Sequence, residues 1–217
     1  EQALSVNVED VPTRLIAGVS AYFLRDYNTA NQHLSLVASE LPASHQALRI
    51  LADTQLKLGM TLEANDTITQ FDQISEQEAA LVSGVGHALL REGEVQHARS
   101  VLAKQTTKLT SPKALANVGL LKLSLNDVDG ILDLETALDS VQDKEGTELQ
   151  ASSIEDVLVK AYLSTKQYDK AMAIAERWKS SLSHAVKGAM LAGAVYVQQG
   201  MTDEARSAYQ SALNNDP

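Results

Sequence analysis

VKGAMLAGAVYVQQGMTDEARSAYQSALNNDP, residues 186–217, is the stretch of sequence that decides the fold. Counted from Val186, marker residues stand at positions 8, 11, 15, 20, 24, 27 and 32: Gly193, Tyr196, Gly200, Ala205, Tyr209, Ala212 and Pro217. Apolar residues recur every three or four residues on both sides of Gly200, which is the period of a helix that buries one face. Gly200 fits the left-handed conformation that ends a helix, and the small Gly193 lets the second helix approach the first. The stretch therefore predicts an antiparallel pair of helices.

The same pattern recurs upstream with a period of 34 residues. Three blocks align without a gap: 11–44, 45–78 and 79–112. In these blocks position 8 is small and position 20 is alanine: Gly18, Ala52 and Gly86, then Ala30, Ala64 and Ala98. The blocks 112–145 and 152–185 keep the pattern less regularly, and a turn that is one residue short puts Gly130 where alanine is expected. Self-similarity at a fixed period of this length indicates a solenoid of stacked helix pairs.

Composition agrees with a helical chain and excludes several classes of function. Hydrophobic residues make up 44% of the 217 residues but aromatic residues only 4%, so the core is expected to consist of small and aliphatic side chains. The chain has no cysteine, which excludes disulfides, thiolate metal sites and a cysteine nucleophile. Its formal net charge of −10 disfavours nucleic acid as a partner. No apolar run approaches the ~20 residues needed to cross a bilayer.

The set small-8, aromatic-11, Gly-15, Ala-20, aromatic-24, Ala-27 and Pro-32 is the pattern of the tetratricopeptide repeat (TPR), which the chain resembles over nearly its whole length. The resemblance implies an all-α fold, a right-handed superhelical solenoid of antiparallel helix pairs. The tryptophan that the family carries near position 4 is absent, and positions 8 and 11 vary. A related helical repeat is the alternative.

A narrower resemblance concerns residues 163–176, 191–200 and 131–135, which are similar to the TPR lipoproteins of bacterial PEP-CTERM/exosortase systems. That resemblance implies a place in the bacterial periplasm or envelope, with a role in exopolysaccharide or surface-protein export. Generic bacterial TPR proteins share much of this sequence, and the cytoplasm is the alternative location.

The register of the repeats predicts how the chain is organised. Residues 1–10 correspond to the end of a truncated preceding repeat, 11–146 to units one to four and 147–217 to units five and six, all in one continuous solenoid. The polar stretch 142–146 is expected to be the longest loop. Because the last unit lacks a polar capping helix, we expect a fragment of a longer protein, with uncapped ends that favour self-association.

Candidate binding residues follow from the TPR resemblance, which implies that positions 2, 5, 9, 12 and 13 of each first helix face a concave groove. The candidate groove residues are Tyr22, Phe23, Arg49, Asp53, Lys57, His87, Arg91 and Lys160. The N-terminal end of this groove is apolar and aromatic, and its middle is basic, which suits an anionic peptide or glycan. As alternatives, Arg49, Asp53 and Lys57 form an ordinary helical ion-pair ladder, and the two aromatic residues pack beneath an upstream repeat.

The sequence shows no motif of a catalytic, cofactor or metal site. None of the five histidines stands four residues from another, and there is neither a nucleophile elbow nor a phosphate-binding loop. We therefore predict a scaffold without enzymatic activity or cofactor that binds a peptide or protein segment. The alternative is a polysaccharide-binding factor of envelope assembly. The residues at positions 5, 6 and 9 do not form the carboxylate clamp of chaperone-binding TPR domains.

Trp178 and Phe71 stand at position 27, where the family prefers alanine. We interpret them as large residues that fill the space left by Gly193 and Gly86 at position 8 of the next unit. The alternative for Trp178 is an exposed anchor for a partner.

Overall fold

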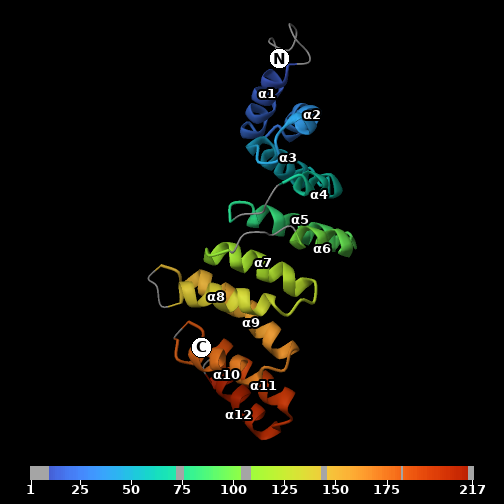
Figure 1. The fold of residues 1–217 in the computed structure, drawn as a ribbon. Helices are drawn as coiled ribbons and strands as arrows, with labels where there is room; N and C mark the ends of the chain where they lie inside the picture. The colour runs from blue at the N-terminus through green and yellow to red at the C-terminus, as the bar shows by residue number, and fades with distance from the viewer. Residues whose placement is uncertain (1–9, 72–75, 104–108, 143–145, 182, 215–217) are drawn as a thin grey trace. The chain divides into compact units, whose positions relative to one another are not determined.

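The computed structural model describes residues 10–71, 76–103, 109–142, 146–181 and 183–214, and the regular structure within these ranges is entirely helical (Figure 1). The helices are α1 (Val11–Phe23), α2 (Tyr27–Val37), the 3-10 helix η1 (Ala38–Glu40), α3 (Gln46–Lys57), α4 (Thr61–Thr69), α5 (Ala79–Arg91), α6 (Val95–Ala103), α7 (Pro112–Ser124), α8 (Gly130–Val141), α9 (Glu148–Ser164), α10 (Tyr168–Lys179), α11 (Ala185–Gln199) and α12 (Thr202–Asn214). The predicted all-α fold is confirmed, with two helices to each repeat.

Several helices begin at residues that satisfy their free N–H groups. The Asp10 side chain accepts a hydrogen bond from the Thr13 N–H at 3.0 Å at the start of α1. The Ser111 hydroxyl accepts one from the Ala114 N–H at 3.3 Å at the start of α7. A proline follows each of these two caps in the first turn, where it has no hydrogen bond to lose. Caps of this kind fix the register of the repeats.

Just after each first helix, the residue at position 15 of the repeat adopts the left-handed region. The six residues there are Arg25, Gly59, Gly93, Asn126, Lys166 and Gly200, with φ between 58° and 85°. Glycine adopts this conformation without a steric penalty, and the three other residues accept some strain. The turn from the first helix to the second is therefore set by repeat position even where glycine is absent.

Small residues at position 8 allow the helices of a pair to approach closely. A methyl carbon added at Gly18 would lie 2.7 Å from Leu34, and one added at Gly193 would lie 2.6 Å from Tyr209. Leu34 and Tyr209 both stand at position 24 of the same unit as their glycine. The predicted close crossing within a unit is confirmed at both places.

The prediction that Trp178 and Phe71 at position 27 fill the space at position 8 of the next unit is wrong. The atoms nearest to a side chain added at Gly193 belong to Tyr209 of the same unit, and those at Gly86 belong to Leu121 of the following unit. Trp178 is only 5% exposed, which also excludes the exposed anchor. Its indole N–H donates to the buried Glu155, which also pairs with Arg177 at 2.5 Å.

The chain forms two compact units, residues 1–133 and 134–217, and the division falls within α8. Among the described residues of the first unit, the larger core cluster consists of aliphatic side chains and the ring of Phe71: Leu48, Ala52, Ala64, Ile68, Phe71, Val82, Val85, Leu89, Ala98, Val101, Leu121 and Leu125. A smaller cluster contains Leu34, Ala47 and Leu51. In the second unit α9 packs on α10, α10 on α11 and α11 on α12. The repeat boundaries predicted at 146 and 147 stay a prediction. Residues 1–9 and 143–145, which belong to the expected preceding repeat and the expected loop, lie outside the described residues.

Polar side chains tie neighbouring repeats together at a sequence distance close to the repeat length. The Thr61 hydroxyl donates to Glu92 at 2.6 Å, and the Ser83 hydroxyl donates to the Asn117 carbonyl at 2.9 Å. Glu76 accepts from the Ser111 N–H at 2.8 Å. Such contacts between adjacent repeats are what stabilises a solenoid, whose repeats touch only their neighbours.

Candidate functional site

An apolar trough lies between α1 and α3 in the first unit. Its volume is about 510 Å³, and it is lined by Leu15, Ile16, Val19, Ser20, Phe23, His45, Gln46, Ala47 and Ile50. Ile16 is 69% exposed and Phe23 is 73% exposed, although both are large apolar side chains. We use the name trough for this set of nine residues.

The sequence of α1 explains why the trough exists. Gly18 and Ala21 are buried, and Gly18 faces Leu34 of α2. Leu15, Val19 and Phe23 are spaced four residues apart, so they form a second apolar row along the same helix. The helix therefore carries more apolar surface than its packing on α2 and α3 covers.

A polar and aromatic cluster surrounds Asp53. The Tyr22 hydroxyl donates to the Asp53 carboxylate at 2.5 Å, and the Lys57 ammonium lies 3.0 Å from the same carboxylate. Lys57 also lies 5.9 Å from the centre of the Tyr27 ring. The hydrogen bond to Asp53, together with burial, raises the pKa of Tyr22 to about 12. Tyr22, Asp53 and Lys57 are thus three predicted groove residues that the structure brings together.

Arg49 has a different partner from the one that helical spacing suggested. It forms an ion pair with Glu78, whose side chain is almost completely buried at the start of α5. The Asp53–Lys57 half of the predicted ladder is present, whereas Arg49 extends to the next repeat instead of Asp53. Arg49 and Lys57 therefore each have a carboxylate within the molecule.

The other predicted groove residues are distributed over both units. His87 and Arg91 lie on α5, where burial and then the charge of Arg91 lower the pKa of His87. Among the described residues Arg91 forms no ion pair, and its side chain is exposed. Phe23 lines the trough and contacts the Tyr22 ring edge-on, with 5.5 Å between ring centres. Lys160 is exposed on α9 in the second unit.

The sequence reasoning missed Ile16 and Ile50 as lining residues. Both stand at position 6 of their units, next to the position 5 that was taken to face the groove. An isoleucine at the same repeat position in two consecutive units is the signal that could have found them. The equivalent residue of the third unit is Gly84, so the apolar row does not continue there.

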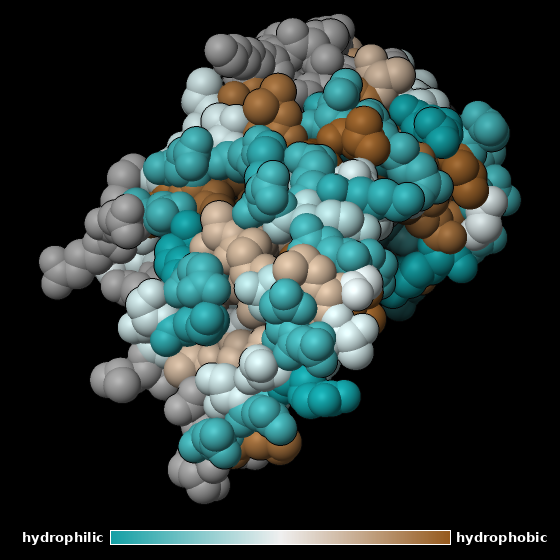
Figure 2. Space-filling view, turned by 90° about the horizontal axis from the view of Figure 1, so that it is seen from below, coloured by the Kyte–Doolittle hydropathy of each residue, from teal (hydrophilic) through white to brown (hydrophobic). Residues whose placement is uncertain are grey.

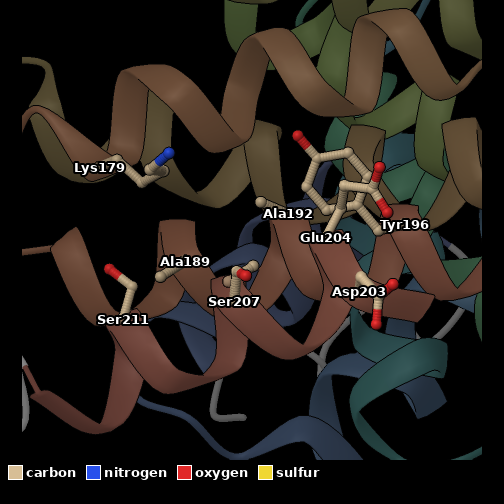
Figure 3. Close-up of a pocket in the computed structure, with 9 residues that line it drawn as sticks. Lys179, Ala189, Ala192, Tyr196, Asp203, Glu204, Ser207 and Ser211 are labelled. Atoms are coloured by element: carbon tan, nitrogen blue, oxygen red, sulfur yellow. The ribbon is translucent and has the colours of Figure 1, made fainter. Parts of the chain in front are cut away.

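A second pocket, of about 490 Å³, lies between α10, α11 and α12 of the second unit (Figure 3). Ala189 and Ala192 form its floor, and Asp203 and Glu204 stand at one end. These two acids lie in the first turn of α12, where carboxylates stabilise the positive end of a helix, so their position has a structural explanation. The face seen in Figure 2 is mostly polar, and its apolar residues form separate patches.

Two further features bear on function. Within the described ranges, His, Asp and Glu side chains form no group of three that could hold a metal ion. The helices of the described chain include none long and apolar enough to cross a membrane.

Comparison with known proteins supports the fold. Residues 131–217 match the family model described as a tetratricopeptide repeat-like domain. No curated protein matches the chain in sequence.

Three crystal structures are similar to this chain over nearly its whole length. A tetratricopeptide repeat protein from Parabacteroides merdae is 13% identical, with a TM-score of 0.56 over 95% of this chain and 80% of that chain. The C-terminal part of a TPR repeat-containing protein from Cytophaga hutchinsonii is 15% identical, with a TM-score of 0.55 over 100% and 88%. BtubC from P. vanneervenii is 15% identical, with a TM-score of 0.51 over 94% and 90%. At these identities the likeness establishes a TPR-like fold.

Proposed function

We propose that this chain is a non-catalytic scaffold that binds a peptide or protein segment on the first helices of its N-terminal unit, with the trough as the anchoring site. The observation that carries the proposal is the exposure of two large apolar side chains, Ile16 and Phe23, in the same cleft of about 510 Å³. Clefts of this size, lined mainly by apolar side chains, are typical ligand sites.

The energetics favour an apolar anchor. Burial of one large apolar side chain contributes about 1.5–3 kcal/mol. The trough lies on two packed helices, so little ordering is needed when a ligand binds, and more of this free energy is retained as affinity. The predicted groove cations Arg49 and Lys57 contribute less to affinity for an anionic partner than free cations would, because each already forms an ion pair, with Glu78 and Asp53 respectively.

Site-specific photo-crosslinking tests the proposal. A photoreactive amino acid replaces Phe23 in one variant and Leu36, which is 57% exposed on α2, in a control variant. We expect a protein that crosslinks at position 23 and not at 36, and whose affinity for the purified chain falls at least about tenfold, or about 1.4 kcal/mol, with Ile16→Asp. A protein that crosslinks equally at both positions, or whose affinity Ile16→Asp leaves unchanged, would contradict the proposal.

A second candidate function is polysaccharide binding in envelope assembly. The exposed ring of Phe23 beside the Tyr22 ring favours it, because sugars stack on aromatic side chains. The envelope location and the export role rest on the sequence resemblance of residues 163–176 and 191–200 alone. Binding on a glycan array that Phe23→Ala abolishes would favour this candidate, and binding to peptides alone would favour the first.

A further inference from the structure

We propose that the occupant of the trough is a short amphipathic helix of a partner protein, which inserts three large uncharged side chains spaced i, i+4 and i+7. This inference rests on the proposed function and specifies the partner's secondary structure and chemistry. Three observations carry it: the length of the trough, the scarcity of hydrogen-bonding groups in it and the absence of charge from its lining.

The length of the trough matches two turns of helix. Its lining on α1 extends from Leu15 to Phe23, which is eight residue steps or about 12 Å along the helix axis. Residues i and i+7 of a second helix are about 10.5 Å apart. A row of three side chains on that helix would therefore lie along the row formed by Leu15, Val19 and Phe23, with Ala47 and Ile50 of α3 on the other side.

Hydrogen bonding favours a helix over an extended segment. An extended peptide brings unpaired N–H and C=O groups that need partners when they are buried. The trough has few polar groups, and one of them is already engaged, because His45 Nδ1 accepts from the Ala47 N–H at 3.1 Å. Ser20 and Gln46 are the polar side chains that remain in the lining. A helix satisfies its own backbone and presents only side chains, which is what this surface can accept.

The charges fix the chemistry of the two faces of the partner helix. No Asp, Glu, Lys or Arg lines the trough, so a charged group inserted there would lose water without gaining a counter-ion. The inserted face is therefore uncharged. The chain as a whole carries a net charge of −10, and the nearby cations Arg49 and Lys57 are paired with carboxylates. The outward face of the partner helix is therefore basic, since the field of the chain attracts it.

Synthetic peptides provide the test. The probe is a capped peptide of about four helical turns with leucines at i, i+4 and i+7 and lysine, glutamine and alanine elsewhere. One control peptide carries a proline at a central polar position, which keeps the leucines and breaks the helix. A second control has the same composition with leucines at alternate residues, as an extended strand would present them. Binding to the full chain is measured by fluorescence anisotropy.

Matched protein variants locate the binding. Ile16→Asp and Phe23→Asp alter the trough, whereas Leu24→Asp alters a neighbouring residue that is 80% exposed and absent from the lining. Circular dichroism confirms that each variant is folded. We expect the helical probe to bind the wild-type chain, with affinity reduced at least about tenfold by either control peptide and by either trough variant. Leu24→Asp should leave the affinity unchanged.

Each of the other outcomes decides against the inference in a different way. If the alternating peptide binds as well as the helical probe and Ile16→Asp weakens both, the occupant is extended, and the proposed function stands. If the helical probe binds and the trough variants have no effect, the trough is not the site, and the proposed function loses its anchor. If no probe binds the wild-type chain at concentrations on the order of 1 mM, the inference is overturned.

Discussion

At the scale of the residue, position 15 shows how repeat geometry overrides local preference. Arg25, Asn126 and Lys166 adopt positive φ although only glycine does so without strain. At Gly59 a β-carbon would meet no atom within 4 Å, so a substitution there changes backbone strain and nothing else in the packing. The free-energy cost of the left-handed conformation can therefore be measured in two ways, by replacing a glycine at position 15 and by introducing one there.

We expect Gly59→Ala to lower the free energy of unfolding by about 1 kcal/mol, because alanine is strained in the left-handed region. Lys166→Gly should raise it by up to about 1 kcal/mol, since it relieves that strain while it increases the entropy of the unfolded chain. Urea denaturation followed by circular dichroism measures both. Equal shifts of the same sign would contradict this account of the turn.

Arg49 and Arg91 were both predicted to face a groove, but they differ in their partners. Arg49→Glu places a second carboxylate beside the buried Glu78, so we expect a loss of about 1–3 kcal/mol, less than for a fully buried pair because Arg49 is 35% exposed. Arg91→Glu changes an exposed residue and should alter stability by less than about 0.5 kcal/mol. Chemical denaturation of the two variants gives the comparison. Similar losses would show that Arg91 has a structural role as well.

The raised pKa of Tyr22 has a consequence for stability at high pH. Its pKa is about 12 in the folded chain, against an ordinary value of 10.0, so folding favours the protonated phenol. The stabilisation is complete below pH 10 and is lost as the pH rises through the folded-state value. We expect the phenolate absorbance of Tyr22, taken as the difference between wild type and Tyr22→Phe, to titrate near 12. Asp53→Asn should lower that value, and titration near 10 in the wild type would contradict the hydrogen bond.

At the scale of the element, the close approach of the two helices of a pair is the feature whose stability a substitution should reduce most. Gly193→Leu would force a side chain into the Tyr209 ring and should destabilise by about 1–3 kcal/mol through overpacking between α11 and α12. Gln198→Leu on the same helix changes an exposed residue and should be nearly neutral. Denaturant melts of the two variants provide the check. If both lose the same stability, the crossing does not depend on the absence of a side chain at position 8.

At the scale of the whole molecule, exposed apolar surface predicts self-association. Ile16 and Phe23 are exposed in the first unit, and Met190, Val197 and Leu213 are exposed in the second. Apolar surface that water covers in the monomer tends to be buried between copies. We expect the mass measured by light scattering to rise with protein concentration and to rise less for Ile16→Asp. A constant monomeric mass in wild type and variant would remove this expectation.

The sequence could predict the fold because the relevant signals are local and repeated. The caps at Asp10 and Ser111 and the turn residue at position 15 each act within a few residues of chain, so a single sequence carries them. The packing of Trp178 was predicted wrongly because its partner, Glu155, lies 23 residues away on another helix. Choices between such partners depend on distances between helices, which periodicity does not contain.

The sequence predicted only part of the candidate site, because repeat position indicates which residues share a face but not which partners they contact. Tyr22, Asp53 and Lys57 stand at repeat positions that share a face, and the structure brings them together. Arg49 has carboxylates available both on its own helix and in the next repeat, and the sequence alone does not say which of them it binds. Ile16 and Ile50 were missed because the assumed set of facing positions left out position 6.

The polar contacts between neighbouring repeats depend on the repeat length, because each joins residues at set positions of two repeats. Tyr22 donates to Asp53, 31 residues ahead, and Thr61 donates to Glu92 across the same interval. If the block 45–78 were excised, the position of Asp53 would be taken by His87, which can also accept a hydrogen bond from a phenol. Excision of that complete repeat therefore leaves Tyr22 with an acceptor at the same repeat position, whereas a deletion of another length would place a residue of a different repeat position there.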